Sequence, residues 1–412
     1  MSVRSLPYWL EYIEQQHPQT IALGLERVLQ VLAALKIKFT CPVISVGGTN
    51  GKGSTCAVLE AVLKSAGYRT GLYTSPHLLR YNERVRIAGR EAEDAALCGA
   101  FAAVEAARGA VPLTYFEFGT LAALVLFSRE NLEAVILEVG LGGRLDAVNA
   151  VDADCAILTS VGIDHVEFLG NTREDIGREK AGIFRPGRPA VVADPEPPRS
   201  VLATEAKLLL LGRDFGYRAQ GTQWAYWGPC GKRSGLAHPA LRGAMQLRNA
   251  SAALAALDTL RDRLPIAMQD VRRALAEVAL PGRFQVLPGR PQVILDVAHN
   301  PQAAAVLAAN LGESGFSPEV IAVFGMLRDK DIAGVVRAVA PRITRWHLAT
   351  LPGLRGADSR FLSRIFLELQ IKTPINEHGS VAEALAAARS EAGEGDKIVV
   401  FGSFLTGAGA YG

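Results

Sequence analysis

A glycine-rich segment that follows an apolar run and precedes a helix-like stretch constrains this chain more than any other feature. Residues 45–55 read S-V-G-G-T-N-G-K-G-S-T. Glycine tolerates positive φ, so the backbone can curl around an anion, and the N–H groups at the start of a helix attract phosphate. Lys52 is placed to reach the β- and γ-phosphates of a nucleotide. The segment therefore predicts a strand, a phosphate-binding loop and a helix in succession, as in α/β proteins.

The loop departs from the strict pattern G-x-x-x-x-G-K-[S/T] at two positions. Val46 replaces the first glycine, and Gly53 replaces the hydroxyl residue that usually binds Mg²⁺. That hydroxyl must come from another part of the chain, although a serine follows one position late. The predicted ATP contacts within the loop are Thr49, Asn50, Gly51, Lys52, Gly53 and Ser54. The alternative, a glycine-rich surface turn, does not account for the strand before the loop and the helix after it.

The composition fits a globular protein and disfavours several other classes. The chain has 412 residues, which suggests two or three domains, and 49% of them are apolar. A net charge of +3 is too small to indicate binding to nucleic acid or to a membrane surface. The five cysteines are scattered, which is typical of reduced thiols in a cytoplasmic protein and not of disulfides or a zinc site. No run is long and apolar enough to predict a transmembrane helix, and no segment has the pattern of a secretory signal.

Strands and helices alternate through the first two thirds of the chain. The predicted strands are 43–46, 70–73, 134–139 and 155–159, with weaker strands at 190–192 and 208–211. The predicted helices are 21–35, 55–65, 95–107 and 120–129. This alternation predicts a parallel sheet that is covered by helices on both faces. Ligands bind such sheets at the carboxyl ends of the strands.

Two Pro-Gly pairs between residues 281 and 290 mark a linker. A second alternating pattern follows it, with predicted strands at 293–297, 320–324, 346–350 and 397–401 and predicted helices at 301–311, 332–340, 359–369 and 382–390. We therefore expect a first domain over residues 1–284 and a smaller doubly wound α/β domain over 285–412. The second domain has no G-x-G-x-x-G, so we do not expect a dinucleotide site there.

Further strings accompany the phosphate loop along nearly the whole chain. They are Y-T-S-P-H-L-L-R (73–80), L-T-Y-F-E-F-G (113–119), L-E-V-G-L-G-G-R-L-D-A (137–147), T-S-V-G-I-D-H (159–165), G-R-E-K-A-G-I-F-R (177–185), P-G-R-F (281–284) and L-D-V-A-H-N-P (295–301). In order and spacing they resemble the Mur ligase superfamily, in its branch of bacterial bifunctional dihydrofolate synthases/folylpolyglutamate synthases. The resemblance implies a central domain with a phosphate loop and a parallel sheet, followed by a smaller Rossmann-like domain.

The resemblance also implies a reaction. Enzymes of this branch are ATP- and Mg²⁺-dependent ligases that add L-glutamate to dihydropteroate and to reduced folates through an acyl phosphate. A cytoplasmic monomer with only small-molecule partners is expected, without nucleic acid or membrane. Two alternatives remain open: a Mur-type ligase that joins an amino acid to another carboxylate, and a nucleotide-binding protein without ligase activity.

Glu138 interrupts an apolar strand, where an isolated carboxylate needs a cation or several donors. A structural salt bridge would satisfy it equally well. The resemblance makes Ser75, Glu138 and His165 ligands of Mg²⁺, with two ions expected, and makes Lys52, His165 and Lys180 the catalytic set. It further implies a carbamate, derived from CO₂, on Lys180. From the residues alone, His165 could be an ordinary polar side chain and Lys180 part of a solvated helix turn.

Four further residues are expected to contact ATP. Asn249 begins an apolar helix, where it could equally be an N-cap. Arg283 lies in the linker, and arginine suits bidentate contact with phosphate. The resemblance places Asp296 and His299, at the end of the first strand of the second domain, beside the nucleotide.

Short segments with aromatic and acidic side chains are expected to bind the pterin. An aminopterin ring needs a flat apolar face and a hydrogen-bond acceptor. The resemblance assigns this role to Thr114, Tyr115, Phe116 and Glu117, to Leu145, Asp146 and Ala147, and more weakly to Ala22, Leu23, Gly24 and Leu25. Ordinary core packing of the aromatic residues is the alternative.

Overall fold

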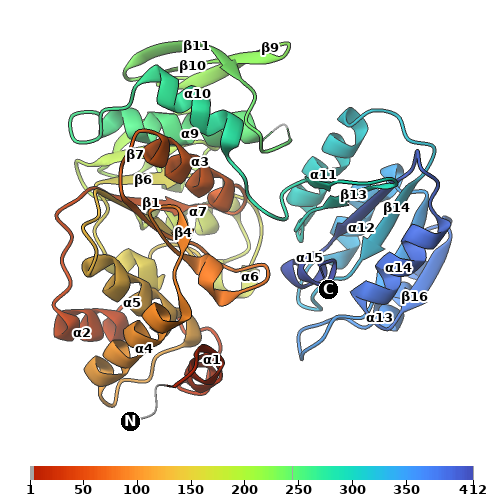
Figure 1. Ribbon diagram of the computed structural model, residues 1–412, viewed down its shortest axis with the longest axis horizontal. Helices are drawn as coiled ribbons and strands as arrows, with labels where there is room; N and C mark the ends of the chain where they lie inside the picture. The colour runs from red at the N-terminus through yellow and green to blue at the C-terminus, as the bar shows by residue number, and fades with distance from the viewer. Residues whose placement is uncertain (1–3, 244, 412) are drawn as a thin grey trace. The chain divides into compact units, whose positions relative to one another are not determined.

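The computed structural model describes residues 4–243 and 245–411. They divide into two compact units (Figure 1). The first consists of residues 1–240 and 247–278, and the second of residues 241–246 and 279–412. The domain boundary after residue 284 stays a prediction, and each unit is described by itself below.

The first unit is built on an eight-stranded sheet with the order β4-β3-β2-β5-β1-β6-β7-β8. Its strands are β1 (Val43–Gly47), β2 (Thr70–Tyr73), β3 (Val85–Ile87), β4 (Arg90–Glu91), β5 (Ala134–Glu138), β6 (Cys155–Leu158), β7 (Pro189–Val192) and β8 (Lys207–Leu210). The neighbouring strands in the series β2-β5-β1-β6-β7-β8 pair in parallel, while β3 and β4 add an antiparallel edge next to β2. Every residue of β1, β5 and β6 is buried, as expected for strands covered on both faces.

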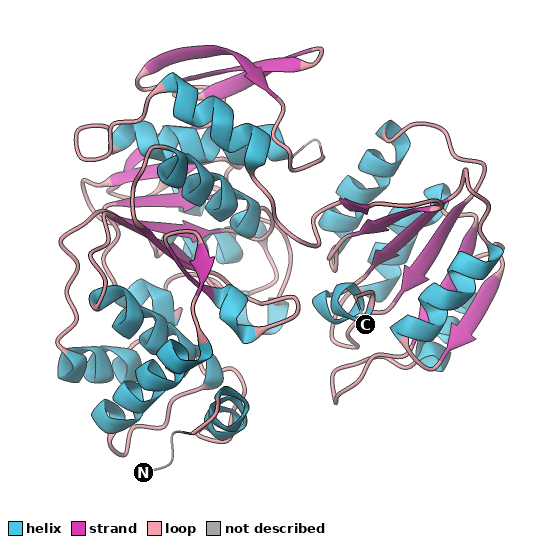
Figure 2. Cartoon of the chain, in the orientation of Figure 1, coloured by secondary structure: helices cyan, strands magenta, loops and turns pink. Residues whose placement is uncertain are grey.

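Helices lie against both faces of this sheet (Figure 2). The helices of the first unit are α1 (Leu6–Glu14), α2 (Glu26–Leu35), α3 (Lys52–Ser65), α4 (Asp94–Arg108), α5 (Tyr115–Ser128), α6 (Val166–Leu169), α7 (Arg173–Ala181), α8 (Arg199–Leu202), α9 (Gln246–Thr259) and α10 (Met268–Glu277), with 3₁₀ turns η1 (Tyr81–Arg84) and η2 (Ala147–Ala150). In α5 every residue from Glu117 to Phe127 is buried. Within the described part of the chain, no helix has both the length and the hydrophobicity that crossing a membrane requires.

A small antiparallel sheet in the first unit was not predicted. It consists of β9 (Gly216–Gln220), β10 (Gln223–Gly228) and β11 (Gly231–Ala237), in the order β11-β10-β9. Trp224 and Tyr226 of β10 are fully buried, and the Tyr226 hydroxyl donates to Asp258 Oδ2 of α9 at 2.6 Å. These contacts fix the sheet to α9.

The second unit has a six-stranded sheet with the order β12-β13-β17-β14-β15-β16. Its strands are β12 (Gln285–Leu287), β13 (Gln292–Leu295), β14 (Val320–Phe324), β15 (Arg345–Ala349), β16 (Ile375–His378) and β17 (Lys397–Phe401). Its helices are α11 (Pro301–Glu313), α12 (Ile332–Val339), α13 (Ser359–Glu368), α14 (Val381–Glu391) and α15 (Phe404–Gly409), with the 3₁₀ turn η3 (Ala340–Arg342). All strand pairs are parallel except that of the edge strand β12. An aromatic cluster of Phe324, Trp346, Phe366 and Phe401 fills one side of the core.

Every predicted strand is present, with ends that differ by at most two residues from the prediction, whereas β3, β4, β12 and β16 were not predicted. Larger differences lie at helix starts. The helix predicted at 120–129 begins at Tyr115, because the Thr114 hydroxyl accepts from the Glu117 N–H at 3.2 Å and caps it. The helix predicted at 21–35 begins only at Glu26, after Gly24 with its φ of 144°. The N-cap alternative for Asn249 is wrong, since α9 already begins at Gln246.

Candidate active site

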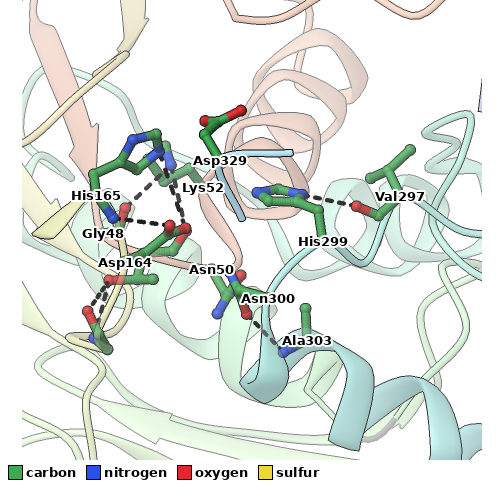
Figure 3. Close-up of polar contacts among 12 residues, drawn as sticks. Gly48, Asn50, Lys52, Asp164, His165, Val297, His299, Asn300, Ala303 and Asp329 are labelled. Atoms are coloured by element: carbon green, nitrogen blue, oxygen red, sulfur yellow. Dashed lines mark hydrogen bonds and ion pairs between the residues drawn. The ribbon is translucent and has the colours of Figure 1, made fainter. Parts of the chain in front are cut away.

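The phosphate loop lies between the carboxyl end of β1 and the first turn of α3. Gly48 and Gly51 have φ values of 144° and 94°, which favour glycine. The Thr55 N–H is bonded to the Gly51 carbonyl at 2.9 Å, so the amides before it in α3 have no acceptor one turn earlier in the helix. The Lys52 ammonium folds back and donates to the Gly48 carbonyl at 3.1 Å (Figure 3). The N–H groups of the first turn of α3 and the Lys52 ammonium thus lie at the same end of the helix, which is the arrangement that binds phosphate.

Two other segments hold the loop in shape. A side-chain carbon on Gly48 would lie 1.9 Å from Thr159 Oγ1, and one on Gly51 would lie 2.7 Å from Asn249 Oδ1. The Thr159 hydroxyl, at the end of β6, donates to the Asn50 carbonyl at 2.7 Å. Asn249 therefore lies against the loop, as its predicted ATP role requires, and Thr159 supports the loop from the next strand.

Glu138 lies beside the loop because of strand register. In β5 it pairs with Val46 of β1, and Leu137 pairs with Tyr73 of β2. The backbone N–H of Ser75 donates to Glu138 Oε2 at 3.1 Å, and the Glu138 residue is only 4% exposed. The structure thus brings two predicted metal ligands together next to the phosphate loop. A carboxylate and a hydroxyl are the oxygen donors that Mg²⁺ prefers, so the residues fit a divalent cation.

The third predicted ligand, His165, follows β6 on the other side of β1. Its φ is 51°, and its backbone N–H donates to Asp164 Oδ1 at 2.9 Å (Figure 3). The ring Nε2 is 4.0 Å from Asp164 Oδ2. Over residues 4–243 and 245–411, no group of three His, Cys, Asp or Glu side chains is arranged to hold a metal. The predicted set of Ser75, Glu138 and His165 contains only two side chains of these kinds, so it stays a prediction.

Lys180 lies in α7 and is only 4% exposed. Burial and then the positive charge of Lys52 lower its pKa from 10.5 to about 7, while Asp164 and Asp146 act in the opposite direction. A substantial fraction of this amine is therefore neutral near neutral pH. The alternative that Lys180 is part of a solvated helix turn is wrong.

Asp146 caps the turn η2 and is buried. Its two oxygens accept from the Leu141 N–H at 2.8 Å and the Val148 N–H at 3.0 Å. Burial nevertheless raises its pKa from 3.8 to about 7. The carboxyl can therefore hold or release a proton near neutrality.

The three segments predicted to bind the pterin meet in space. The Arg27 guanidinium donates to Glu117 Oε1 at 2.8 Å and to the Ala22 carbonyl at 2.7 Å. The Gly24 N–H donates to the Leu145 carbonyl at 3.3 Å. Arg27 was not among the predicted site residues, although it ends the string A-L-G-L-E-R.

Much of the hydrogen-bonding capacity of Glu117 is used within the protein. Besides Arg27, its carboxylate accepts from the Thr114 N–H at 2.8 Å. Phe116 packs so closely against Gly140 that a side-chain carbon there would lie 2.5 Å from its ring, and Tyr115 stands edge-on to Tyr81. The core-packing alternative therefore holds for these rings, which pack at the start of α5 and beside the loop that follows β5, and the pterin role stays a prediction.

In the second unit, the predicted ATP residues gather at the carboxyl end of β13. Asp296 accepts from the Phe284 N–H at 2.9 Å and the Ala298 N–H at 2.7 Å. Desolvation raises its pKa, and the positive charge of Arg283 opposes that shift. The Arg283 guanidinium lies over the Phe404 ring, 5.1 Å from its centre. The contacts of Asp296 therefore give it a structural role within the unit, whatever it binds.

His299 follows on the same loop. Its Nδ1 lies 2.8 Å from the Val297 carbonyl, and the next residue, Asn300, caps α11 by accepting from the Ala303 N–H at 2.9 Å (Figure 3). A carbonyl partner makes Nδ1 the donor and fixes the ring orientation.

Comparison with known proteins identifies the family. Residues 46–257 match the Mur ligase middle domain, and residues 282–404 match the Mur ligase glutamate ligase domain. The dihydrofolate synthase/folylpolyglutamate synthase of Escherichia coli is 45% identical over 406 residues, which cover 97% of this chain and 93% of that protein. This chain belongs to the dihydrofolate synthase/folylpolyglutamate synthase family of Mur ligases.

Solved structures of this family are also similar over almost the whole chain. The E. coli FolC in complex with DHPP and ADP has a TM-score of 0.94 at 44% identity and covers 99% of this chain and 97% of its own. A bifunctional folylpolyglutamate synthase/dihydrofolate synthase with Mn, AMPPNP and L-glutamate bound has a TM-score of 0.90 at 44% identity, with 98% of this chain and 97% of its own covered. The fold of this dihydrofolate synthase/folylpolyglutamate synthase family member is therefore that of the Mur ligases, as the resemblance implied.

Proposed function

We propose that the chain is an ATP- and Mg²⁺-dependent ligase that adds L-glutamate to dihydropteroate, which gives dihydrofolate, and to reduced folates, which gives folylpolyglutamates. The observation that carries this proposal is the phosphate loop with Lys52 above it and the buried Glu138 beside it. The substrates come from the names of the relatives: DHPP and ADP in one structure, and a nucleotide analogue with L-glutamate in another.

The proposed reaction has two steps. A carboxylate oxygen of the folate attacks the γ-phosphorus of ATP, and the bond to the departing ADP breaks. The amine of L-glutamate then attacks the acyl carbon, loses a proton and expels phosphate. In such transfers the protein mainly positions the reactants and neutralises charge.

The roles of the individual residues follow from this scheme as proposals. The loop amides and Lys52 hold the phosphates, with Asn249 against the loop. Glu138 and Ser75 hold a divalent cation, which supplies charge neutralisation at the phosphates when bound. His165 is proposed as a ligand of a second ion. Arg283, Asp296 and His299 are proposed to contact the nucleotide from the second unit.

We further propose that Lys180 is carbamylated. A neutral amine is needed to attack CO₂, and the lowered pKa of this buried lysine supplies it. The modification replaces a cation with an anion beside Asp164 and Lys52, which would favour a bound cation there. A cytoplasmic monomer is also proposed, and the five cysteines, all free thiols, suit a reducing compartment.

The test is an assay of ADP release with ATP, Mg²⁺, L-glutamate and dihydropteroate. The Lys52→Ala variant should lose at least about 100-fold in kcat, because a charge contact to the transferring phosphate is removed. Lys64→Ala is the matched control, since Lys64 is an exposed lysine at the other end of α3. A folded Lys52→Ala enzyme with normal turnover, or no dependence of ADP release on dihydropteroate, would contradict the proposal.

A further inference from the structure

A cavity of about 480 Å³ in the second unit carries an excess of positive charge. It lies beside the first turns of α13, and its lining includes Arg328, Arg360 and Arg364 with a single carboxylate, Asp358. Three guanidinium groups against one carboxylate leave two positive charges. None of these residues has a role in the reaction proposed above.

Arg328 is held in a fixed position at one side of the cavity. Its Nη2 lies 2.5 Å from Asp358 Oδ2, its Nε donates to the Gly356 carbonyl at 2.8 Å, and its guanidinium lies over the Phe361 ring at 5.1 Å. Asp358 also caps α13 by accepting from the Phe361 N–H at 2.8 Å. The end of the helix is therefore already capped, and the positive charge of the cavity comes from its arginines.

Arg360 and Arg364 supply the uncompensated charge. Both are exposed, and within the described residues neither forms an ion pair. They are four residues apart in α13, which places them on one face at a separation of about 6 Å along the axis. Like charges at this spacing weaken a helix, and an anion bound between them would relieve that repulsion.

We propose that this cavity binds the γ-linked glutamate tail of a folylpolyglutamate. The inference rests on the proposed function and adds a site for the growing product. Each γ-linked glutamate carries one free α-carboxylate, and arginine is the side chain best suited to bind carboxylates through paired hydrogen bonds.

The spacing of the charges agrees with such a ligand. An α-linked chain extends by about 3.5 Å per residue over three main-chain atoms, so a γ-linked residue with five such atoms extends by roughly 6 Å. Successive α-carboxylates then match the separation of Arg360 and Arg364. Dihydropteroate has no glutamate tail, so the cavity would act only on glutamylated substrates.

The experiment compares two substrates on the full chain. The Arg360→Ala/Arg364→Ala variant should show about a tenfold higher KM for a tetrahydrofolate triglutamate, with the KM for dihydropteroate unchanged. The Arg360→Glu/Arg364→Glu variant should show a larger increase. Arg337→Ala/Arg389→Ala removes two exposed arginines from α12 and α14 and should leave both KM values unchanged.

Calorimetric titration with γ-linked triglutamate alone gives a second readout that needs no turnover. The wild type should bind it and the Arg360→Ala/Arg364→Ala variant should not. The proposal would be overturned if the KM values for both substrates rose equally in the Arg360→Ala/Arg364→Ala variant, or if neither rose. It would also be overturned if the wild type bound inorganic phosphate in the titration but did not bind triglutamate. Failure of the wild type to use dihydropteroate would instead refute the proposed function, while the titration would still report on the cavity.

Discussion

Replacing Lys180 by methionine should stabilise the protein at neutral pH and abolish its activity. The lysine is only 4% exposed, and its pKa is lowered from 10.5 to about 7. The difference of about 3.5 units, at 1.36 kcal/mol each, corresponds to a cost of about 5 kcal/mol for folding with the lysine protonated. Methionine fills similar space without that charge, so most of this cost should disappear.

The dependence on pH gives the sign of the effect. Between pH 7 and 10.5 the unfolded chain binds a proton at Lys180 that the folded protein lacks, so the free energy of unfolding should rise with pH. The expected slope is about 1.4 kcal/mol per pH unit. Asp146, whose pKa is raised to about 7, contributes the opposite slope only below that pH. Burial raises the pKa of the Cys56 and Cys155 thiols above their ordinary value of 9.0, so these groups oppose the slope as the pH approaches 9. The range from pH 7 to about 8 is therefore the one in which the lysine dominates.

The assay is urea unfolding at several pH values from 7 to about 8 in buffer depleted of CO₂. The wild type should show the slope, and Lys180→Met should show little of it. Lys64→Met, an exposed lysine of α3, should keep it. Added bicarbonate should stabilise the wild type but not Lys180→Met, because only the wild type can form the carbamate. Equal slopes in the wild type and Lys180→Met would refute the reasoning.

Three further variants test the packing around the site. At Gly51 the φ is 94°, and a side-chain carbon would lie 2.7 Å from an amide oxygen. Gly51→Ala should therefore lower the free energy of unfolding by about 2 kcal/mol and abolish nucleotide binding. Gly67→Ala, with a φ of 90° and open space around it, should show only the backbone cost in urea unfolding. Glu117→Gln should cost about 3 kcal/mol because it breaks a buried ion pair, and Glu130→Gln, in an exposed pair, less than about 1 kcal/mol; equal costs would show that burial is not the cause. Asp296→Asn should lower the free energy of unfolding by about 1–3 kcal/mol, because the new amide group would face the Phe284 N–H. Hydrogen exchange should then be faster around residue 284, and unchanged exchange would show that the carboxylate is dispensable.

The sheets could be predicted because their central strands are buried on both faces. Such strands read as uninterrupted apolar runs, and Thr70–Tyr73, Val320–Phe324 and Lys397–Phe401 were predicted to the residue. The phosphate loop could also be predicted, because glycines followed by a lysine between a strand and a helix form a pattern that is specific for phosphate binding. Apolar runs and the glycine-rich loop were therefore enough to predict two α/β domains with mainly parallel sheets.

The small sheet β9–β11 could not be predicted, because its side chains are mostly exposed and its strands show no regular alternation. The early start of α5 is visible in the sequence as the capping pattern T-x-x-E at 114–117, in the segment interpreted above as a pterin site or as core packing. Arg27 and Thr159 could not be assigned from the sequence. Their roles depend on partners about 90 and 110 residues away in the chain, which only the fold brings close.

Strand order places a positive side chain between two negative ones at the carboxyl end of the sheet. The order β2-β5-β1-β6 places Ser75 and Glu138 on one side of the loop that follows β1, and Asp164 on the other. Lys52, which starts the helix after β1, thus has a carboxylate following the strand on each side. It lowers the pKa of Lys180 and at the same time offsets the negative charge of Glu138 and Asp164. A phosphate bound at the loop would therefore meet one cation between two carboxylates, and that excess of negative charge is the physical reason why such a site needs divalent cations to bind a nucleotide.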